Sequence, residues 1–227
     1  MSNQSPQLVR LNKFLAERLG VSRREADELI KNGKVLIDGE PAQLGSRIDK
    51  SNKVCYNNKI VPFDTEYLYL AFNKPIGYVC SRRAQGAVPT LYELLPAEYQ
   101  KLKTVGRLDK DSSGLILLTN DGDFAFQMTH PKFHKEKVYE VILNRPLEPL
   151  HQQMISDYGV MLEDGPSKFL VMHDNDKYIV TLSEGRNRQI RRTFAALGYR
   201  VDALHRTQFG KYQLSGLKPG EYAIIKP

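Results

Sequence analysis

The sequence predicts an α+β protein of two domains, because helix and strand patterns are mixed along the chain and strand patterns are more numerous. We expect a small domain of two helices and a small sheet over residues 8–62, and a linker over residues 63–67. A larger domain with a mixed, mainly antiparallel sheet would then occupy residues 68–227. With 227 residues, 41% of them hydrophobic, the chain is long enough for a small and a medium domain.

Two helices open the first domain. Between residues 9 and 20 the apolar residues are spaced as one helical face, and Gly20 ends the pattern. In the next segment Ser22 is followed three residues later by Glu25, which predicts a capping box, and Gly33 ends that helix. Both helices are therefore bounded by their own sequence signals.

Two hairpins should follow these helices. The pairs Asp38-Gly39 and Asn57-Asn58 each separate two short extended segments, and such pairs favour two-residue turns. They predict the small sheet of the first domain.

The larger domain is recognised by recurrent apolar segments of strand length. Residues 115–119, "LILLT", form a continuous apolar run that predicts a strand buried on both faces. A helix is expected over 187–198, and residues 1–8 and 82–90 read as a loose polar end and a loop. The other strand segments expected are 67–72, 138–143 and 178–182.

Composition excludes several protein classes. No run of about 18 apolar residues occurs, so no transmembrane helix is expected, and the first ten residues lack the apolar core of a secretory signal. The two cysteines, Cys55 and Cys80, show no CxxC spacing, so neither a disulfide framework nor a metal site follows from them. We therefore expect a cytoplasmic protein with no metal site.

Charge placement suggests an anionic partner. The net charge of +7 only weakly favours nucleic acid. Ser22, Arg23 and Arg24 open a helix, where backbone N–H groups and two guanidinium groups can converge on a phosphate. The alternative is a solvated helix face.

Asp109 is the strongest candidate for a catalytic group. It lies in a charged turn, "GRLDKD", directly before Ser112, Ser113 and Gly114, whose small size admits a second backbone or a substrate. The buried strand after the turn would hold this carboxylate rigidly. Asp111 competes locally, but we interpret it as a turn residue.

Two further segments offer partners for Asp109. The segment "EGRNRQIRR" (184–192) concentrates guanidinium groups on one helix face, and a guanidinium keeps a nearby carboxylate ionised. The alternative for this cluster is phosphate binding without catalysis. Tyr139 lies inside a strand pattern, where it either packs in the core or stacks on an unpaired base.

The N-terminal region resembles an S4 domain, the small RNA-binding module of ribosomal protein S4 and of several RNA-modifying enzymes. The resemblance rests on "VRLNKFLAERLGVSRREADELIKNGKVLIDGEP". It implies docking on structured RNA, with these residues facing phosphates: Arg10, Lys13, Ser22, Arg23, Arg24 and Lys34.

The remainder resembles the pseudouridine synthases of the RsuA/RluB type, in "NKPIGYVCS", "GRLDKDSSGLILLTNDGD", "EKVYEV" and "EGRNRQIRR". By this resemblance Asp109 matches the catalytic aspartate and Tyr139 the tyrosine that packs against the target base. Arg191 matches the basic residue paired with the aspartate, and Ile190 its apolar neighbour. Flanking phosphates would be held by Arg107, Arg186, Arg188 and Arg192.

The implied reaction breaks the N1–C1′ bond of a uridine in ribosomal RNA and rejoins the base through C5. It needs no cofactor or metal, in agreement with a sequence that has neither GxGxxG nor a P-loop. Two mechanisms are compatible with these residues, attack of Asp109 on C1′ and formation of a glycal. The residues are also compatible with RNA of either ribosomal subunit as the substrate. A monomer is expected, because one chain contains every part.

Two other functions would also suit a chain with an S4 domain. A non-catalytic RNA-binding protein would have lost the aspartate or its basic partner, yet Asp109 and Arg191 are both present. A methyltransferase on an S4 adapter would need a glycine-rich nucleotide loop after an early strand, which "NKPIGYVCS" does not provide.

Overall fold

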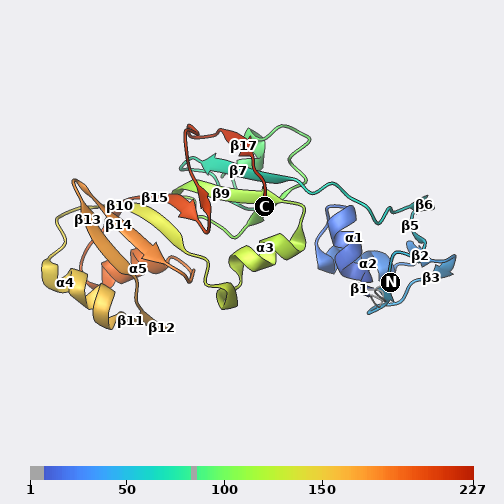
Figure 1. Cartoon of the computed structure of the whole chain (residues 1–227), viewed down its shortest axis with the longest axis horizontal. Helices are drawn as coiled ribbons and strands as arrows, with labels where there is room; N and C mark the ends of the chain where they lie inside the picture. Colours follow the sequence, from blue (N-terminus) through green and yellow to red (C-terminus); the bar gives the residue numbers. More distant parts are fainter. Residues whose placement is uncertain (1–7, 83–85) are drawn as a thin grey trace, which may run out of the picture. The chain divides into compact units, whose positions relative to one another are not determined.

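The computed structural model describes residues 8–82 and 86–227. It contains two compact units, Met1–Tyr67 with Asn120–Gly122, and Leu68–Thr119 with Asp123–Pro227. Figure 1 shows helices and strands mixed in both, which confirms the α+β prediction. Most of the predicted polar end and part of the predicted loop over 82–90 lie outside the described residues. No described helix is long and apolar enough to cross a membrane.

The first unit contains the two predicted helices, α1 (Leu11–Arg18) and α2 (Arg23–Lys31). The capping box of α2 is formed: the Glu25 amide donates to Ser22 Oγ at 3.1 Å and the Ser22 amide to Glu25 Oε2 at 2.7 Å. The strands are β1 (Val9–Arg10), β2 (Val35–Ile37), β3 (Glu40–Pro41), β4 (Arg47–Ile48), β5 (Val54–Tyr56) and β6 (Lys59–Ile60).

Both predicted hairpin turns are present in this unit. The sheet has the order β3-β2-β5-β6, and its two hairpins turn at Asp38-Gly39 and Asn57-Asn58. All four turn residues have positive φ, between 48° and 95°. Two successive positive φ values define the type I′ turn, whose twist matches that of the strands, so asparagine, aspartate and glycine are favoured there.

The second unit is built on one large sheet. Among the described residues its order is β13-β14-β10-β15-β9-β7-β17, with β16 added to β15 and β8 to β9. Every pairing is antiparallel except that of β9 with β15, which confirms a mixed, mainly antiparallel sheet. The strands are β7 (Tyr69–Lys74), β8 (Lys103–Val105), β9 (Ser113–Thr119), β10 (Lys137–Leu143), β13 (Leu170–Asp174), β14 (Lys177–Leu182), β15 (Val201–Phe209), β16 (Tyr212–Gln213) and β17 (Tyr222–Ile224).

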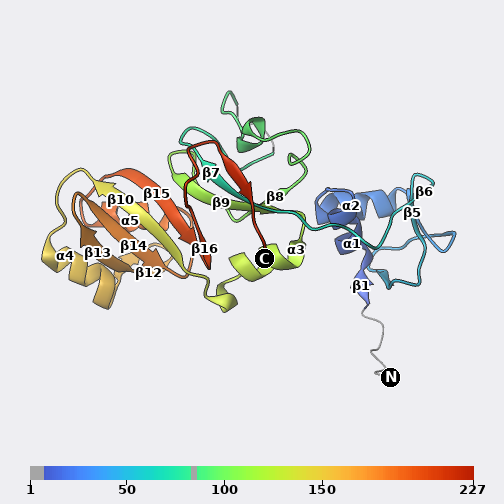
Figure 2. The ribbon, with the colours of Figure 1, turned by 45° about the horizontal axis from the view of Figure 1, so that its top comes forward.

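Shorter elements surround this sheet. In Figures 1 and 2 helix α5 lies beside the half of the sheet that contains β10, β14 and β15. It begins at Gln189 and not at the predicted residue 187, because Arg188 has a left-handed φ of 46° and is therefore not part of the right-handed helix. The elements are α3 (Gly122–Thr129), α4 (Pro149–Gln153), α5 (Gln189–Ala196), β11 (Val160–Leu162), β12 (Gly165–Ser167) and the short helices η1 (Leu91–Leu94), η2 (Pro131–Phe133) and η3 (Met154–Tyr158).

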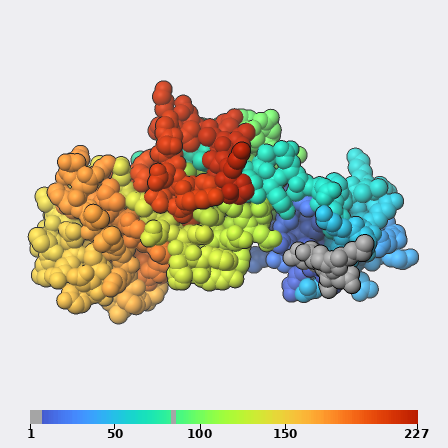
Figure 3. Space-filling model, in the orientation of Figure 1, coloured from blue at the N-terminus to red at the C-terminus, as the bar shows by residue number. Residues whose placement is uncertain are grey.

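Strand β9 lies in the core, as its apolar sequence predicts. Leu115 and Leu117 pack in one apolar cluster, whereas Ile116 and Leu118 pack in another on the opposite face. All four side chains are fully buried. The C-terminal segment is fixed to neighbouring β7 through β17 and forms part of the surface of this unit (Figure 3, red). The turn that precedes β9 is therefore attached to a fully buried strand of the sheet.

Candidate active site

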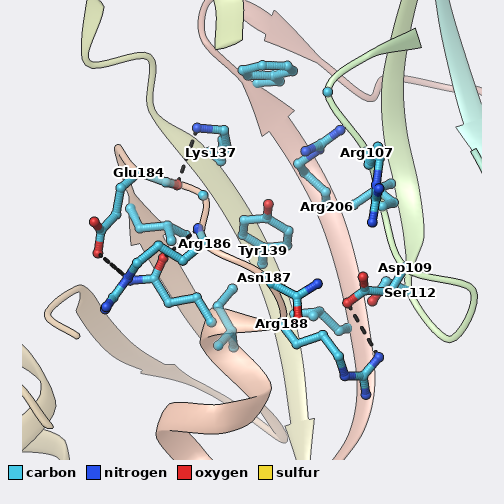
Figure 4. Close-up of a pocket in the computed structure, with 18 of the residues that line it drawn as sticks. Arg107, Asp109, Ser112, Lys137, Tyr139, Glu184, Arg186, Asn187, Arg188 and Arg206 are labelled. Carbon is cyan, nitrogen blue, oxygen red and sulfur yellow. Dashed lines mark hydrogen bonds and ion pairs between the residues drawn. The ribbon is translucent and has the colours of Figure 1, made fainter. Parts of the chain in front are cut away.

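The second unit contains a cavity of about 570 Å³ at the ends of four segments. These are the turn before β9, the start of β10, the loop from β14 to α5, and β15 (Figure 4). The volume is within the range of small-ligand sites. Six of the predicted site residues line it: Arg107, Asp109, Tyr139, Arg186, Arg188 and Ile190.

The turn that carries Asp109 is held by a buried lysine at the end of β7. Lys74 is fully buried, and its ammonium donates to the carbonyl oxygens of Pro75, Asp109 and Ser112 at 2.7–3.1 Å. These bonds use all three of its donors. Burial lowers the pKa of Lys74 from its ordinary value. Sequence reasoning missed this residue; a lysine ending an apolar strand, in "FNKP", is the signal that was available.

The loop after Lys74 holds the same turn at two further points. The Gly77 amide donates to the Lys110 carbonyl at 2.8 Å. The Cys80 thiol lies 3.4 Å from both the amide nitrogen and the carbonyl oxygen of Leu108. Burial raises the pKa of this thiol, so it stays neutral and serves packing. The backbone on both sides of Asp109 is consequently fixed.

Arg188, rather than the predicted Arg191, forms the ion pair with Asp109. Its Nη1 lies 3.5 Å from Asp109 Oδ2. Arg191 instead donates to the carbonyl oxygens of Asp111 and Val201, both at 2.8 Å, and does not line the cavity. The reason is the left-handed backbone at Arg188, which places that side chain outside the helix and in the cavity, while Arg191 follows the helix surface.

Asp111 does more than the turn role assigned to it from the sequence. Arg188 donates to both of its carboxylate oxygens, at 3.0 and 2.9 Å, and Arg191 Nε lies 3.3 Å from Oδ2. The hydrogen bonds from Arg188, with a smaller contribution from the charge of Arg191, hold the pKa of Asp111 below its ordinary value. Asp111 therefore aims Arg188, and Arg188 in turn reaches Asp109.

Tyr139 lies in the core and also contributes to the cavity surface. Its side chain is buried in the core, yet the ring lines the cavity (Figure 4). A β-bulge between Val138 and Tyr139 shifts the register of β10 against β15, and bulges of this kind redirect side chains. The residue of β15 that pairs with Tyr139 is Arg206.

Arg206 also connects β15 to β9. It pairs with Gly114 in the parallel pairing of β15 with β9, where a Cβ on Gly114 would lie 2.3 Å from the Arg206 carbonyl oxygen. Gly114 thus admits a second backbone, one of the two possibilities predicted for the small residues. This close approach places β9, the strand after Asp109, against β15, whose other neighbour is β10 with Tyr139.

Two of the arginines predicted to bind phosphate are directed at Asp164 instead. Arg192 donates to both carboxylate oxygens of Asp164, at 3.0 and 2.8 Å. Arg186 donates to the same carboxylate and to the carbonyl oxygens of Asp164, Gly165 and Pro166 at 2.9–3.1 Å. The structure therefore assigns both side chains to the connection between α5 and the β11–β12 hairpin.

The first unit gathers part of its predicted phosphate-facing set. A cavity of about 300 Å³ is lined by Arg10, Lys13, Arg23 and by Arg47, which sequence reasoning missed. Arg10 and Arg47 are direct partners in the β1–β4 pair, where like charges repel unless an anion lies between them. The remaining three, Ser22, Arg24 and Lys34, are exposed and do not line this cavity.

The family is decided by the match of residues 68–196 to the RNA pseudouridylate synthase model. The chain belongs to that family. Residues 9–55 match the S4 domain model. Both resemblances seen in the sequence are thus confirmed.

Individual relatives agree with the family over the full chain length. The chain is 39% identical over 224 residues to "Ribosomal small subunit pseudouridine synthase A" of Pasteurella multocida, covering 96% of each chain. It is 35% identical over 230 residues to "Ribosomal large subunit pseudouridine synthase B" of Bacillus subtilis, covering 96% of this chain and 92% of the relative. The chain is also similar to a crystal structure of a pseudouridylate synthase, with 34% sequence identity and a TM-score of 0.69. The match covers 96% of each chain.

Proposed function

We propose that this pseudouridine synthase isomerises a uridine of ribosomal RNA without a cofactor, and that Asp109 is the catalytic carboxylate. The observation that carries the proposal is the position of Asp109 on a braced turn, in one cavity with Arg188 and Tyr139. The names of the relatives, which refer to ribosomal subunits, support ribosomal RNA as the substrate. The enzyme would act as a monomer in the cytoplasm, since one chain supplies the whole site.

The residues divide the steps of the reaction among them. A cavity of this volume accommodates one nucleotide taken out of its stack. Tyr139 presents an aromatic wall against which a uracil ring packs. Arg188 keeps Asp109 ionised, and Asp109 either attacks C1′ or removes a sugar proton while the N1–C1′ bond breaks. The base then turns, C5 bonds to C1′, and the C5 proton leaves while N1 gains one, so the composition is unchanged.

The S4 domain would hold the RNA by its backbone. Arg10, Lys13, Arg23 and Arg47 line a single cavity, and cations grouped in this way bind phosphate oxygens. Arg191, by contrast, would act at a distance, by fixing the Asp109–Asp111 turn through the Asp111 carbonyl.

Mapping of pseudouridines tests the proposed function. In a strain that lacks the gene, one uridine of ribosomal RNA should lose its modification. Purified protein should then restore it in ribosomal RNA or in a subunit assembly intermediate. The proposal is wrong if the pseudouridine pattern of both subunit RNAs is unchanged by the deletion.

A further inference from the structure

We propose that Lys137 and Arg206 form a second cationic subsite in the cavity, which binds a phosphodiester group of the substrate RNA next to the target uridine. The inference rests on the proposed function for the identity of the RNA. It concerns the part of the cavity around Phe209, whereas the chemistry is assigned to Asp109 and Arg188. In the view of Figure 4 Tyr139 lies between Lys137 and Asp109.

Arg206 supplies the first observation, a buried guanidinium that is only partly satisfied. The side chain is 2% exposed, and its Nε donates to the Leu115 carbonyl at 2.7 Å. Its Nη2 is buried without a hydrogen-bond partner, although the residue lines the cavity. The guanidinium carbon lies 4.9 Å from the ring centre of Phe209 and 6.0 Å from that of Tyr139. A buried donor left unpaired is costly, so a ligand acceptor is expected there.

Lys137 supplies the second observation, an ammonium group above the same Phe209 ring. Its Nζ lies 5.3 Å from the ring centre. It donates only to the backbone carbonyls of Lys135, Ser183 and Glu184, at 3.3–3.4 Å, which is longer than usual for a charged donor. Lys137 and Arg206 therefore stand over one aromatic ring, and both line the cavity.

The carboxylate of Glu184 does not form an ion pair with Lys137 or Arg206. Glu184 bonds Lys137 through its backbone carbonyl, as the dashed line in Figure 4 shows. Its carboxylate accepts a hydrogen bond from the Gln189 side chain and lies 3.6 Å from Arg186 Nε. Burial and the charge of Arg206, opposed by Glu184, lower the pKa of Lys137 to about 8. An anion between the two cations would remove this repulsion.

A phosphodiester fits the subsite better than a neutral oxygen of the base. Two cations on one ring create a site for an anion, and RNA carries one phosphate at every nucleotide. A uracil carbonyl would satisfy a single donor and leave the repulsion between the cations. Arg107 lines the same cavity, is exposed, and adds a third positive charge.

Salt dependence of RNA binding tests the subsite. Each phosphate contact makes the slope of log K against log salt concentration more negative by about 0.7–0.9. With a ribosomal RNA transcript as the probe, Lys137→Gln should weaken binding by about tenfold at low salt. It should also make the slope less steep, by roughly the amount of one phosphate contact. Lys226→Gln, which removes an exposed lysine in the same unit, should leave both unchanged. Lys137→Arg should restore the slope.

A modified RNA identifies the group that is bound. Once the target uridine is mapped, a methylphosphonate linkage beside it removes one phosphate charge from the probe. This linkage should weaken binding by the wild-type protein but not by Lys137→Gln. Arg206→Gln is a second variant, with folding checked by its melting temperature, because Arg206 also bonds β9.

Three results would overturn the subsite. One is that affinity and salt slope are both unchanged in folded Lys137→Gln, and the second is a loss of affinity with the slope unchanged, which indicates a neutral partner. The third is equal sensitivity of wild type and Lys137→Gln to the methylphosphonate at either neighbouring linkage. The salt measurement records RNA binding and not turnover. Its result can therefore be interpreted even if the proposed reaction is wrong.

Discussion

Two carboxylates two residues apart have separate tasks in this site. Asp111 receives a bidentate hydrogen bond from Arg188, whereas Asp109 is 3.5 Å from the same guanidinium. Asp109 is thus oriented by charge while its oxygens stay available in the cavity. Sequence spacing alone could not separate them, since residues i and i+2 share a face in a strand but not in a turn.

The role of Arg188 gives a prediction at the scale of one residue. Arg188→Ala should lower kcat by about 100-fold, because a preorganised charge beside the reacting group is lost. Arg192→Ala, which removes a neighbouring arginine paired with Asp164, should change kcat far less. Single-turnover rates of pseudouridine formation measure both. Equal losses in the two variants would remove Arg188 from the reaction.

The pKa of Lys137 gives a second prediction at this scale. Its folded-state pKa of about 8 lies below the ordinary value of 10.5, because burial and Arg206 disfavour the charged form. Between these two values the unfolded chain binds more protons than the folded chain, so this group makes the free energy of unfolding rise with pH. Urea denaturation at pH 7.5 and pH 9.5 should show this increase, and Lys137→Gln should show less of it. An increase of the same size in the variant would contradict the assignment.

At the scale of elements, the contact between β9 and β15 builds the cavity wall. Gly114→Ala should destabilise the protein by more than about 2 kcal/mol, because φ is +105° and the new Cβ would overlap the Arg206 backbone. Gly216→Ala is a matched control: φ is +70° but no atom lies within 4 Å, so only the cost of the backbone conformation applies.

Thermal unfolding distinguishes these two substitutions. For a chain of this size each kcal/mol corresponds to roughly 2–4 °C in Tm. We expect Gly114→Ala to lower Tm clearly more than Gly216→Ala does. Similar Tm values would mean that the approach of the two strands is not rigid.

Element positions were predicted well where the signal is local. The capping box at Ser22 and both two-residue turns depend only on neighbouring residues, and they form as expected. The parallel contact of β9 with β15 joins residues about ninety positions apart, so periodicity gives no sign of it. The same applies to Lys74, since two of its three acceptors, the carbonyl oxygens of Asp109 and Ser112, lie in another segment.

At the scale of the whole molecule, the S4 domain and the candidate active site belong to units with separate apolar cores. The double variant Arg10→Ala, Arg23→Ala should therefore raise KM for ribosomal RNA and lower the salt slope of binding, with kcat nearly unchanged. Steady-state kinetics at two salt concentrations measure this. A large fall in kcat with KM unchanged would contradict the division of tasks.

Much of the whole molecule could be predicted because the motifs are long and specific. "GRLDKDSSGLILLT" places Asp109 before a buried strand, and the structure places both in that relation. The resemblance to the family matched Arg191 to the partner of Asp109, whereas in the structure a left-handed residue at position 188 makes the helix start at Gln189 and Arg188 lies 3.5 Å from Asp109. Backbone exceptions of this kind have no periodic signature in a sequence.

The central claim is that Asp109 is the catalytic carboxylate. The most direct test is release of tritium from C5 of labelled uridine in ribosomal RNA, with Asp109→Asn compared with Asp111→Asn. Asp109→Asn should abolish release while RNA affinity is retained, and Asp111→Asn should reduce release without abolishing it, because Arg188 loses its anchor. Wild-type release by Asp109→Asn would contradict the account.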